Sequence, residues 1–273
     1  MTIAKGSFGF HCVAATLACA LAGNAAARPE APRTVSSLVI DADDGETLYA
    51  SDADIVRAPA SLTKMMTLFL VFDAIEAGRL RTSDRITMSR HAAGQQPSKL
   101  GLSPGRSLSL RAAIEAVVVE SANDVAVALA ERLGGNERAF AEAMTARARS
   151  LGMRHTRFAN ATGLTSRGNR TTAHDIALLS LAMLREHPRG YDYFATRSFH
   201  WANRTIANHN HLLGRVPGVD GIKTGYTVDA GYNLAASAKR HGKRLIAVVL
   251  GERTAAARDL RVSHLLEVGF AGG

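Results

Sequence analysis

The sequence predicts an α+β fold in which an antiparallel sheet is built from both chain ends and a helical middle region covers it. Three observations lead to this prediction. Strand-like segments occur near the start and in the last third, helix-like segments fill the middle, and the strict strand–helix alternation of a parallel sheet is missing. With 273 residues, 47% of them hydrophobic and 21% charged, the chain is long enough to bury a substantial core.

Residues 1–27 are expected to be a secretory signal peptide and not part of the fold. Lys5 is their only charge, an apolar run follows from about Phe8 to Ala22, and small residues at 25–27 suit a cleavage site. An uncleaved anchor is the alternative, although the run is shorter than the ~20 apolar residues of a membrane span. Both cysteines, Cys12 and Cys19, lie here, so the mature chain has no thiolate. We expect an exported, periplasmic chain with a single domain at 28–273.

The first elements can be placed by their turn and stop signals. A strand at Val35–Ile40 precedes the turn residues 43–45, and Thr47–Ala50 can return as its hairpin partner. Pro59–Ala77 reads as a helix with Pro near its start and Gly78 at its end. Four more helices are expected, at Leu110–Glu120, Asp124–Leu133, Arg138–Leu151 and Thr172–Arg185. The last third should hold three strands and a closing helix, at Asp220–Thr227, Asn233–Ala238, Arg244–Gly251 and Ala255–Val268.

Ser61 and Lys64 stand three residues apart in the first turn of the first predicted helix. This spacing places both side chains on one helix face. A serine needs an adjacent base to become a nucleophile, and a lysine can serve when burial or a second cation lowers its pKa. Free N–H groups at a helix start can also stabilise a developing oxyanion. The pair is a candidate nucleophile and base, with a solvated surface pair as the alternative.

Two later motifs supply further polar side chains. Ser121 and Asn123 lie in the break between two predicted helices, where they could be ordinary helix caps. The functional interpretation makes Ser121 a proton relay and lets Asn123 bind a substrate amide. Lys223, Thr224 and Gly225 lie in a predicted strand, where a lysine could simply protect a sheet edge. As site residues, Lys223 and Thr224 would hold a substrate carboxylate, and Gly225 would allow a substrate backbone to pair closely.

In this order, the three motifs are the signature of penicillin-binding proteins and class A β-lactamases. The chain resembles the low-molecular-mass penicillin-binding D-alanyl-D-alanine carboxypeptidases of the S11 serine peptidase family, from about Ser36 to Phe270. Further resembling segments are residues 98–102, 158–164, 171–175 and 230–234. The resemblance implies a β-lactamase/transpeptidase-like fold. The chain departs from many relatives in having Ala122 instead of Gly, and we expect no C-terminal β-domain and at most weak peripheral membrane contact.

The resemblance also implies a reaction. Ser61 would attack the carbonyl between the two terminal D-alanines of a peptidoglycan stem peptide, with Lys64 as base and Ser121 in the proton path. The N–H groups of Ser61 and Tyr226 would form the oxyanion hole. The residues implied to hold the terminal carboxylate are Lys223, Thr224 and Arg258. β-Lactams would be covalent inhibitors at Ser61, and no metal or organic cofactor is required.

The motifs allow two alternative functions, and the charge and the histidines bear on two other kinds of ligand, nucleic acid and metal. A class A-like β-lactamase needs a carboxylate before the helix at Thr172, but residues 158–170 contain no acid. A non-catalytic penicillin-binding envelope module would be expected to lack a motif residue, and none is missing. The net charge of +9 is spread without a basic block, so no nucleic-acid partner is expected. His209 and His211 could share a strand face, but ordinary histidines are favoured over a metal site.

Overall fold

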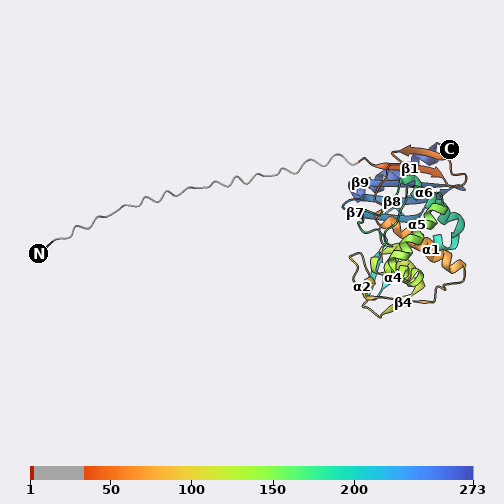
Figure 1. Ribbon diagram of the computed structural model, residues 1–273. Helices are drawn as coiled ribbons and strands as arrows, with labels where there is room; N and C mark the ends of the chain where they lie inside the picture. The colour runs from red at the N-terminus through yellow and green to blue at the C-terminus, as the bar shows by residue number, and fades with distance from the viewer. Residues whose placement is uncertain (3–33, 273) are drawn as a thin grey trace. The chain divides into compact units, whose positions relative to one another are not determined.

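Strands from both ends of the chain form one five-stranded antiparallel sheet. The computed structural model describes residues 1–2 and 34–272, so nearly all of the expected signal peptide lies outside the described residues. Strands β1 (Ser36–Asp41) and β2 (Thr47–Ser51) come from the N-terminal side, and β7 (Val219–Thr227), β8 (Gly231–Arg240) and β9 (Lys243–Glu252) from the C-terminal side. Their order is β2-β1-β9-β8-β7, with β1 and β9 joining the two ends (Figure 1). The edge strand β7 carries the third sequence motif.

The two faces of the sheet bury different partners because side chains alternate along each strand. On one face, Val249 of β9 and Leu234 of β8 pack with Val262 and Leu266 of the closing helix α8 (Ala255–Ala271). On the other face, residues such as Val248 join the main core, which contains the apolar residues of the helical middle region. The expected antiparallel sheet with helical cover is therefore confirmed.

The middle region contributes five helices of ten or more residues. They are α1 (Thr63–Glu76), α3 (Leu110–Val119), α4 (Asn123–Gly134), α5 (Glu137–Ser150) and α6 (Ala173–Glu186). Shorter helical elements are η1 (Ala60–Leu62), α2 (Arg90–Ala93), α7 (Pro188–Tyr191) and η2 (Asp192–Ala195). All of these belong to the unit Arg33–Gly273. Among the described residues, no helix combines the length and the apolar character needed to cross a membrane.

Two features of the middle region were not predicted. The helix expected at Pro59–Ala77 is interrupted at its start, because Ala60 has a φ of 47° and a regular α-helix begins only at Thr63. Two small two-stranded sheets were also missed: β3 (Arg85–Thr87) with β4 (Ser107–Ser109), and β5 (Ser198–Trp201) with β6 (Arg204–Ala207). Strands of three or four residues carry too few alternating positions to be read from a single sequence.

Candidate active site

Ser61 lies in the short η1 turn that precedes α1, and this turn is fastened to the sheet. The side chain of Asn233 on β8 donates from Nδ2 to the carbonyl oxygens of Ala58 and Pro59, both at 3.1 Å. Its Oδ1 accepts a hydrogen bond from the Gly251 N–H at 2.9 Å. A buried amide with all these partners holds the backbone before Ser61 at a fixed distance from β8 and β9.

Lys64 is completely buried beneath Ser61. Its Nζ lies 3.0 Å from Ser61 Oγ, 2.7 Å from Asn123 Oδ1 and 2.7 Å from the carbonyl oxygen of Thr162. Burial, and then the charge of Lys223, hold the pKa of Lys64 well below its ordinary value. A neutral amine at this position can donate its two protons to Asn123 and Thr162, which leaves its lone pair for the Ser61 hydroxyl proton. This is the arrangement that a general base requires.

Ser121 and Asn123 approach the same site from the start of α4. Ser121 has a φ of 61°, and its buried Oγ has no hydrogen-bond partner among the described residues. The Asn123 amide is already engaged by the protein, since its Nδ2 donates to the carbonyls of Gln96 (2.9 Å) and Pro97 (3.1 Å). Asn123 therefore holds Lys64 and the 96–98 segment in place, a role that the sequence did not indicate.

Asp124, the next residue, has no exposed surface and is a second positioning residue that sequence reasoning missed. Its carboxylate accepts hydrogen bonds from the N–H groups of Leu100 (3.1 Å) and Gly101 (2.9 Å). These bonds, together with the 2.7 Å bond from Asn123 N to Ser98 O, tie the segment beside the pocket to the start of α4. In the sequence, only the position of Asp124 next to Asn123 indicates this role.

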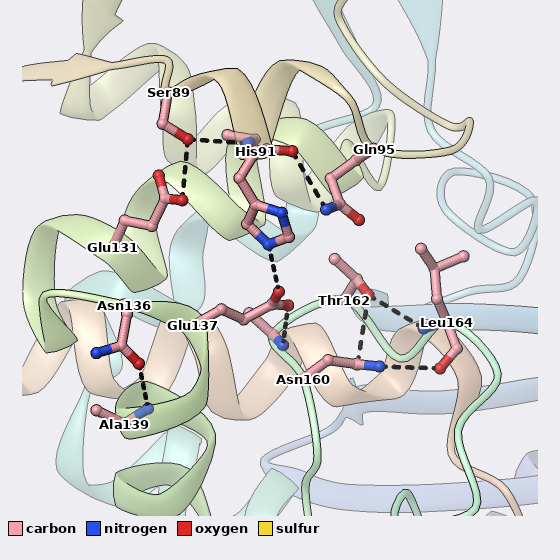
Figure 2. A network of polar contacts seen from close by, with 12 residues as sticks. Ser89, His91, Gln95, Glu131, Asn136, Glu137, Ala139, Asn160, Thr162 and Leu164 are labelled. Atoms are coloured by element: carbon pink, nitrogen blue, oxygen red, sulfur yellow. Dashed lines mark hydrogen bonds and ion pairs between the residues drawn. The ribbon is translucent and has the colours of Figure 1, made fainter.

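The carbonyl of Thr162 reaches Lys64 because a polar network fixes its loop (Figure 2). Asn160 Oδ1 accepts from the Gly163 N–H at 2.7 Å, and its Nδ2 donates to the Leu164 carbonyl at 3.0 Å. Glu137, at the start of α5, accepts from the Ala161 N–H at 3.0 Å and contacts His91 Nε2 at 3.0 Å. The loop is thus bound to Glu137 of α5, which in turn contacts His91 of α2, and its Thr162 carbonyl accepts from the buried amine.

The edge strand β7 runs directly beside the nucleophile turn. A Cβ atom added at Gly225 would lie 3.0 Å from the backbone nitrogen of Ser61 and 3.1 Å from the carbonyl oxygen of Pro59. A side chain here would press on the protein's own turn, which gives glycine a second use beside the substrate pairing expected from the sequence. Lys223 is buried, and its Nζ donates to the Thr224 carbonyl at 3.2 Å. Burial lowers the pKa of Lys223 most, and the charge of Arg258 lowers it further. The charge of Glu120 acts in the opposite direction, and the pKa is about 7.

These elements enclose a cavity of about 400 Å³. The sequence-predicted residues that line it are Ser61, Ser121, Asn123, Thr224, Gly225, Tyr226 and Arg258. The other two, Lys64 and Lys223, are buried beside it. The ring of Tyr226 stacks near that of Tyr232, with centroids 4.2 Å apart. All the sequence-predicted residues therefore meet around one pocket.

His209 and His211 also line this pocket, which the sequence did not indicate. The expectation that they could share a strand face is wrong, because both lie in the loop between the end of β6 at Ala207 and the start of β7 at Val219. Partial burial, and then the charge of Lys223, lower the pKa of His209 to about 4. At neutral pH this histidine is uncharged.

A separate cluster of possible metal ligands lies between α1 and the end of α6. Within the described residues, Asp73, Glu186 and His187 bring one ligand atom each to within 4.8 Å of the others. The guanidinium of Arg147 already contacts both carboxylates, at 3.1 Å for Asp73 and 2.5 Å for Glu186. A cation is therefore supplied by the protein itself at this position.

Comparison with known proteins agrees with the site. The sequence profile of the peptidase S11 family, described as D-alanyl-D-alanine carboxypeptidase, matches residues 23–254. The chain is 36% identical over 241 residues to the D-alanyl-D-alanine carboxypeptidase DacF of Bacillus subtilis, covering 86% of this chain and 62% of the relative. It is also 36% identical over 242 residues to DacA of Escherichia coli K12, covering 86% of this chain and 60% of the relative. The chain thus spans about 60% of the length of these two relatives.

Solved structures show the same fold. Penicillin binding protein 5 from Haemophilus influenzae matches with a TM-score of 0.84 and 33% identity, over 89% of this chain and 73% of that one. Penicillin-Binding Protein D2 from Listeria monocytogenes, in its ampicillin-bound form, matches with a TM-score of 0.79 and 34% identity, over 86% and 96%. The β-lactamase/transpeptidase-like fold and the family resemblance are both confirmed. With its three motifs gathered at one pocket and these matches along most of its length, the chain belongs to the peptidase S11 family of D-alanyl-D-alanine carboxypeptidases.

Proposed function

We propose that this chain is a serine-type D-Ala-D-Ala carboxypeptidase that removes the terminal D-alanine from peptidoglycan stem peptides. The observation that carries the proposal is the buried Lys64 amine, 3.0 Å from Ser61 Oγ, whose other two contacts are both acceptors. Such an amine is suited to accept the serine proton. The curated relatives named above carry the same activity in their names.

The reaction proceeds in two stages. Ser61 Oγ attacks the carbonyl carbon of the penultimate D-alanine while Lys64 Nζ takes the hydroxyl proton. The negative oxygen of the tetrahedral intermediate is bound by the backbone N–H groups of Ser61 and Tyr226, which the closeness of β7 to the nucleophile turn supports. The C–N bond then breaks, and Lys64 passes the proton that it took from Ser61 through Ser121 to the leaving amine. The unpartnered Oγ of Ser121 is available for this transfer.

The second stage regenerates the serine. Water attacks the acyl-enzyme carbonyl while Lys64 accepts a proton from that water, the ester bond to Ser61 Oγ breaks, Lys64 returns the proton to Oγ, and the shortened peptide leaves as a carboxylic acid. The terminal carboxylate of the substrate lies at the cationic end of the pocket, held by Lys223, Thr224 and Arg258. Since the pKa of Lys223 is lowered to about 7, an incoming carboxylate favours its protonated form at neutral pH.

The cellular setting follows from the same proposal. Residues 1–27 direct export, and the protein acts in the periplasm on the cell wall. β-Lactams acylate Ser61 because they present a strained amide beside a carboxylate. The Listeria monocytogenes relative solved in ampicillin-bound and cefotaxime-bound forms supports this part of the proposal.

The test is intact-mass analysis after incubation with a β-lactam and, separately, with a pentapeptide ending in D-Ala-D-Ala. We expect one β-lactam adduct per chain, and a peptide shortened by one alanine with free D-alanine released. Rapid β-lactam hydrolysis with an intact pentapeptide would instead favour a β-lactamase. Adduct formation without any peptide cleavage would favour a non-catalytic penicillin-binding module.

A further inference from the structure

The carboxylate end of the pocket contains a buried arginine that depends on its neighbour in the chain. Arg258 lies in the first turn of α8, lines the pocket and is only 4% exposed. Its Nε and Nη2 atoms lie 2.9 Å and 2.6 Å from Oδ1 of Asp259. Asp259 therefore holds the guanidinium through Nε and Nη2, while Arg258 lines the pocket.

Asp259 also reaches across to the loop before β7. Its other oxygen, Oδ2, lies 2.9 Å from Nδ1 of His211, which lines the same pocket. The Asp259 side chain is 15% exposed and the His211 side chain 52% exposed, so the carboxylate is the inner partner of this pair. A single carboxylate thus connects two separate chain segments of the pocket wall, α8 and the 208–218 loop.

The charges around Arg258 explain why such a clamp is needed. The buried Lys223 is close enough for Arg258 to lower its pKa. Arg258 also contributes to lowering the pKa of His209 on the neighbouring loop. A flexible arginine beside the buried Lys223 would move away from it toward solvent, since like charges repel most strongly where burial lowers the effective dielectric. A carboxylate that accepts from Nε and Nη2 of the guanidinium opposes this tendency and fixes the orientation of Arg258.

We propose that Asp259 is the positioning residue that aims Arg258 at the substrate's terminal carboxylate and ties the His211 loop to α8. The inference rests on the proposed function, because it assumes a substrate that ends in a carboxylate. Asp259 itself touches no reacting atom. Its effect should therefore appear in the affinity for ligands with a free terminal carboxylate and not in the chemistry at Ser61.

The experiment compares Asp259→Ala, Asp259→Asn and the control Glu267→Gln in the full chain. Glu267 lies on the same helix and accepts an equally close pair of bonds from Arg240, at 2.8 Å and 2.7 Å. The substrate is a diacetyl-lysyl-D-Ala-D-Ala peptide, and its binding is compared with that of the same peptide carrying a C-terminal amide. Thermal unfolding of each variant shows whether the fold is intact.

We expect Asp259→Ala to raise KM for the free-acid peptide about tenfold with little change in kcat. Arg258 is then no longer held in place, and its charge-assisted hydrogen bond to the substrate carboxylate is lost. Asp259→Asn should have an intermediate effect, since an amide oxygen can still accept from Arg258 while its NH₂ group cannot accept from His211. Binding of the amide peptide should be the same for Asp259→Ala and the wild type, and Glu267→Gln should leave KM unchanged.

The inference would be overturned if Asp259→Ala lowered kcat alone, or weakened the acid and amide peptides equally. It would also fail if Glu267→Gln raised KM as much as Asp259→Ala, because the effect would then be a general one of α8. These outcomes are separate from the proposed function, which is tested by D-alanine release from the wild-type protein. If the wild type releases no D-alanine, the proposed function fails and this inference fails with it.

Discussion

Gly163→Ala should disable the active site without touching any catalytic side chain. Gly163 follows Thr162 in the loop that contacts Lys64, and an added Cβ would lie 1.8 Å from the carbonyl oxygen of Ala60 and 2.8 Å from Thr63 Oγ1. Non-bonded carbon and oxygen atoms need about 3 Å or more, so the loop and the nucleophile turn must separate by about 1 Å. A shift of about this size at a catalytic group can cost roughly 100-fold in rate.

The matched control is Gly135→Ala. Gly163 and Gly135 have nearly the same positive φ, 78° and 75°, but an added Cβ at Gly135 meets nothing within 4 Å. Both variants should lose about 1–2 kcal/mol of unfolding free energy from the left-handed backbone conformation. Only Gly163→Ala should also lose about 100-fold in the rate of acylation by a chromogenic β-lactam, followed by stopped-flow. Wild-type acylation in a folded Gly163→Ala protein would refute the claim that this contact fixes the nucleophile.

Four further predictions concern other parts of the site. Lys64→Ala should slow acylation by about 10²–10⁴-fold, and an unchanged rate would require another base. Because burial and Lys223 lower the pKa of Lys64, wild-type acylation should rise with pH as the amine loses its proton and level off well below the ordinary lysine value of about 10.4. Asn233→Ala removes the donor to the carbonyls before Ser61, so the free energy of unfolding measured in urea should fall by about 1–3 kcal/mol and acylation should slow. No change in either measurement would contradict the role of Asn233 in holding this turn. Glu137→Gln should lower the unfolding free energy by about 1–2 kcal/mol, whereas Glu142→Gln, in an exposed pair on the same helix, should change it by less than about 1 kcal/mol.

The long elements and the motif residues could be predicted because their signals are local. The helices end near the glycine and proline signals, and a turn at His241 and Gly242 joins β8 to β9 between the two strands expected there. Ser61 and Lys64 could be paired from the sequence because residues three apart lie on the same face of a helix. Even here the sequence could not show the positive φ of Ala60, since alanine has no preference for that conformation.

The remaining site features depend on long-range contacts that leave no local pattern. The partner of Lys64 at Thr162 is a backbone carbonyl, and any residue type supplies one. Asn233 reaches residues 58 and 59 from the far end of the chain, so its role appears only when β8 is placed beside the nucleophile turn. His209 and His211 line the pocket because the loop before β7 folds over it, although they belong to none of the three motifs.

The most direct test of the account is the location of the covalent adduct. Wild-type protein and Ser61→Ala are incubated with the same β-lactam, digested, and analysed by peptide mass mapping. The account predicts one adduct per wild-type chain, on the peptide that contains Ser61, and no adduct on the variant while its thermal unfolding remains cooperative. An adduct on any other residue, or labelling of Ser61→Ala to the wild-type extent, would contradict the assignment of Ser61 as the nucleophile.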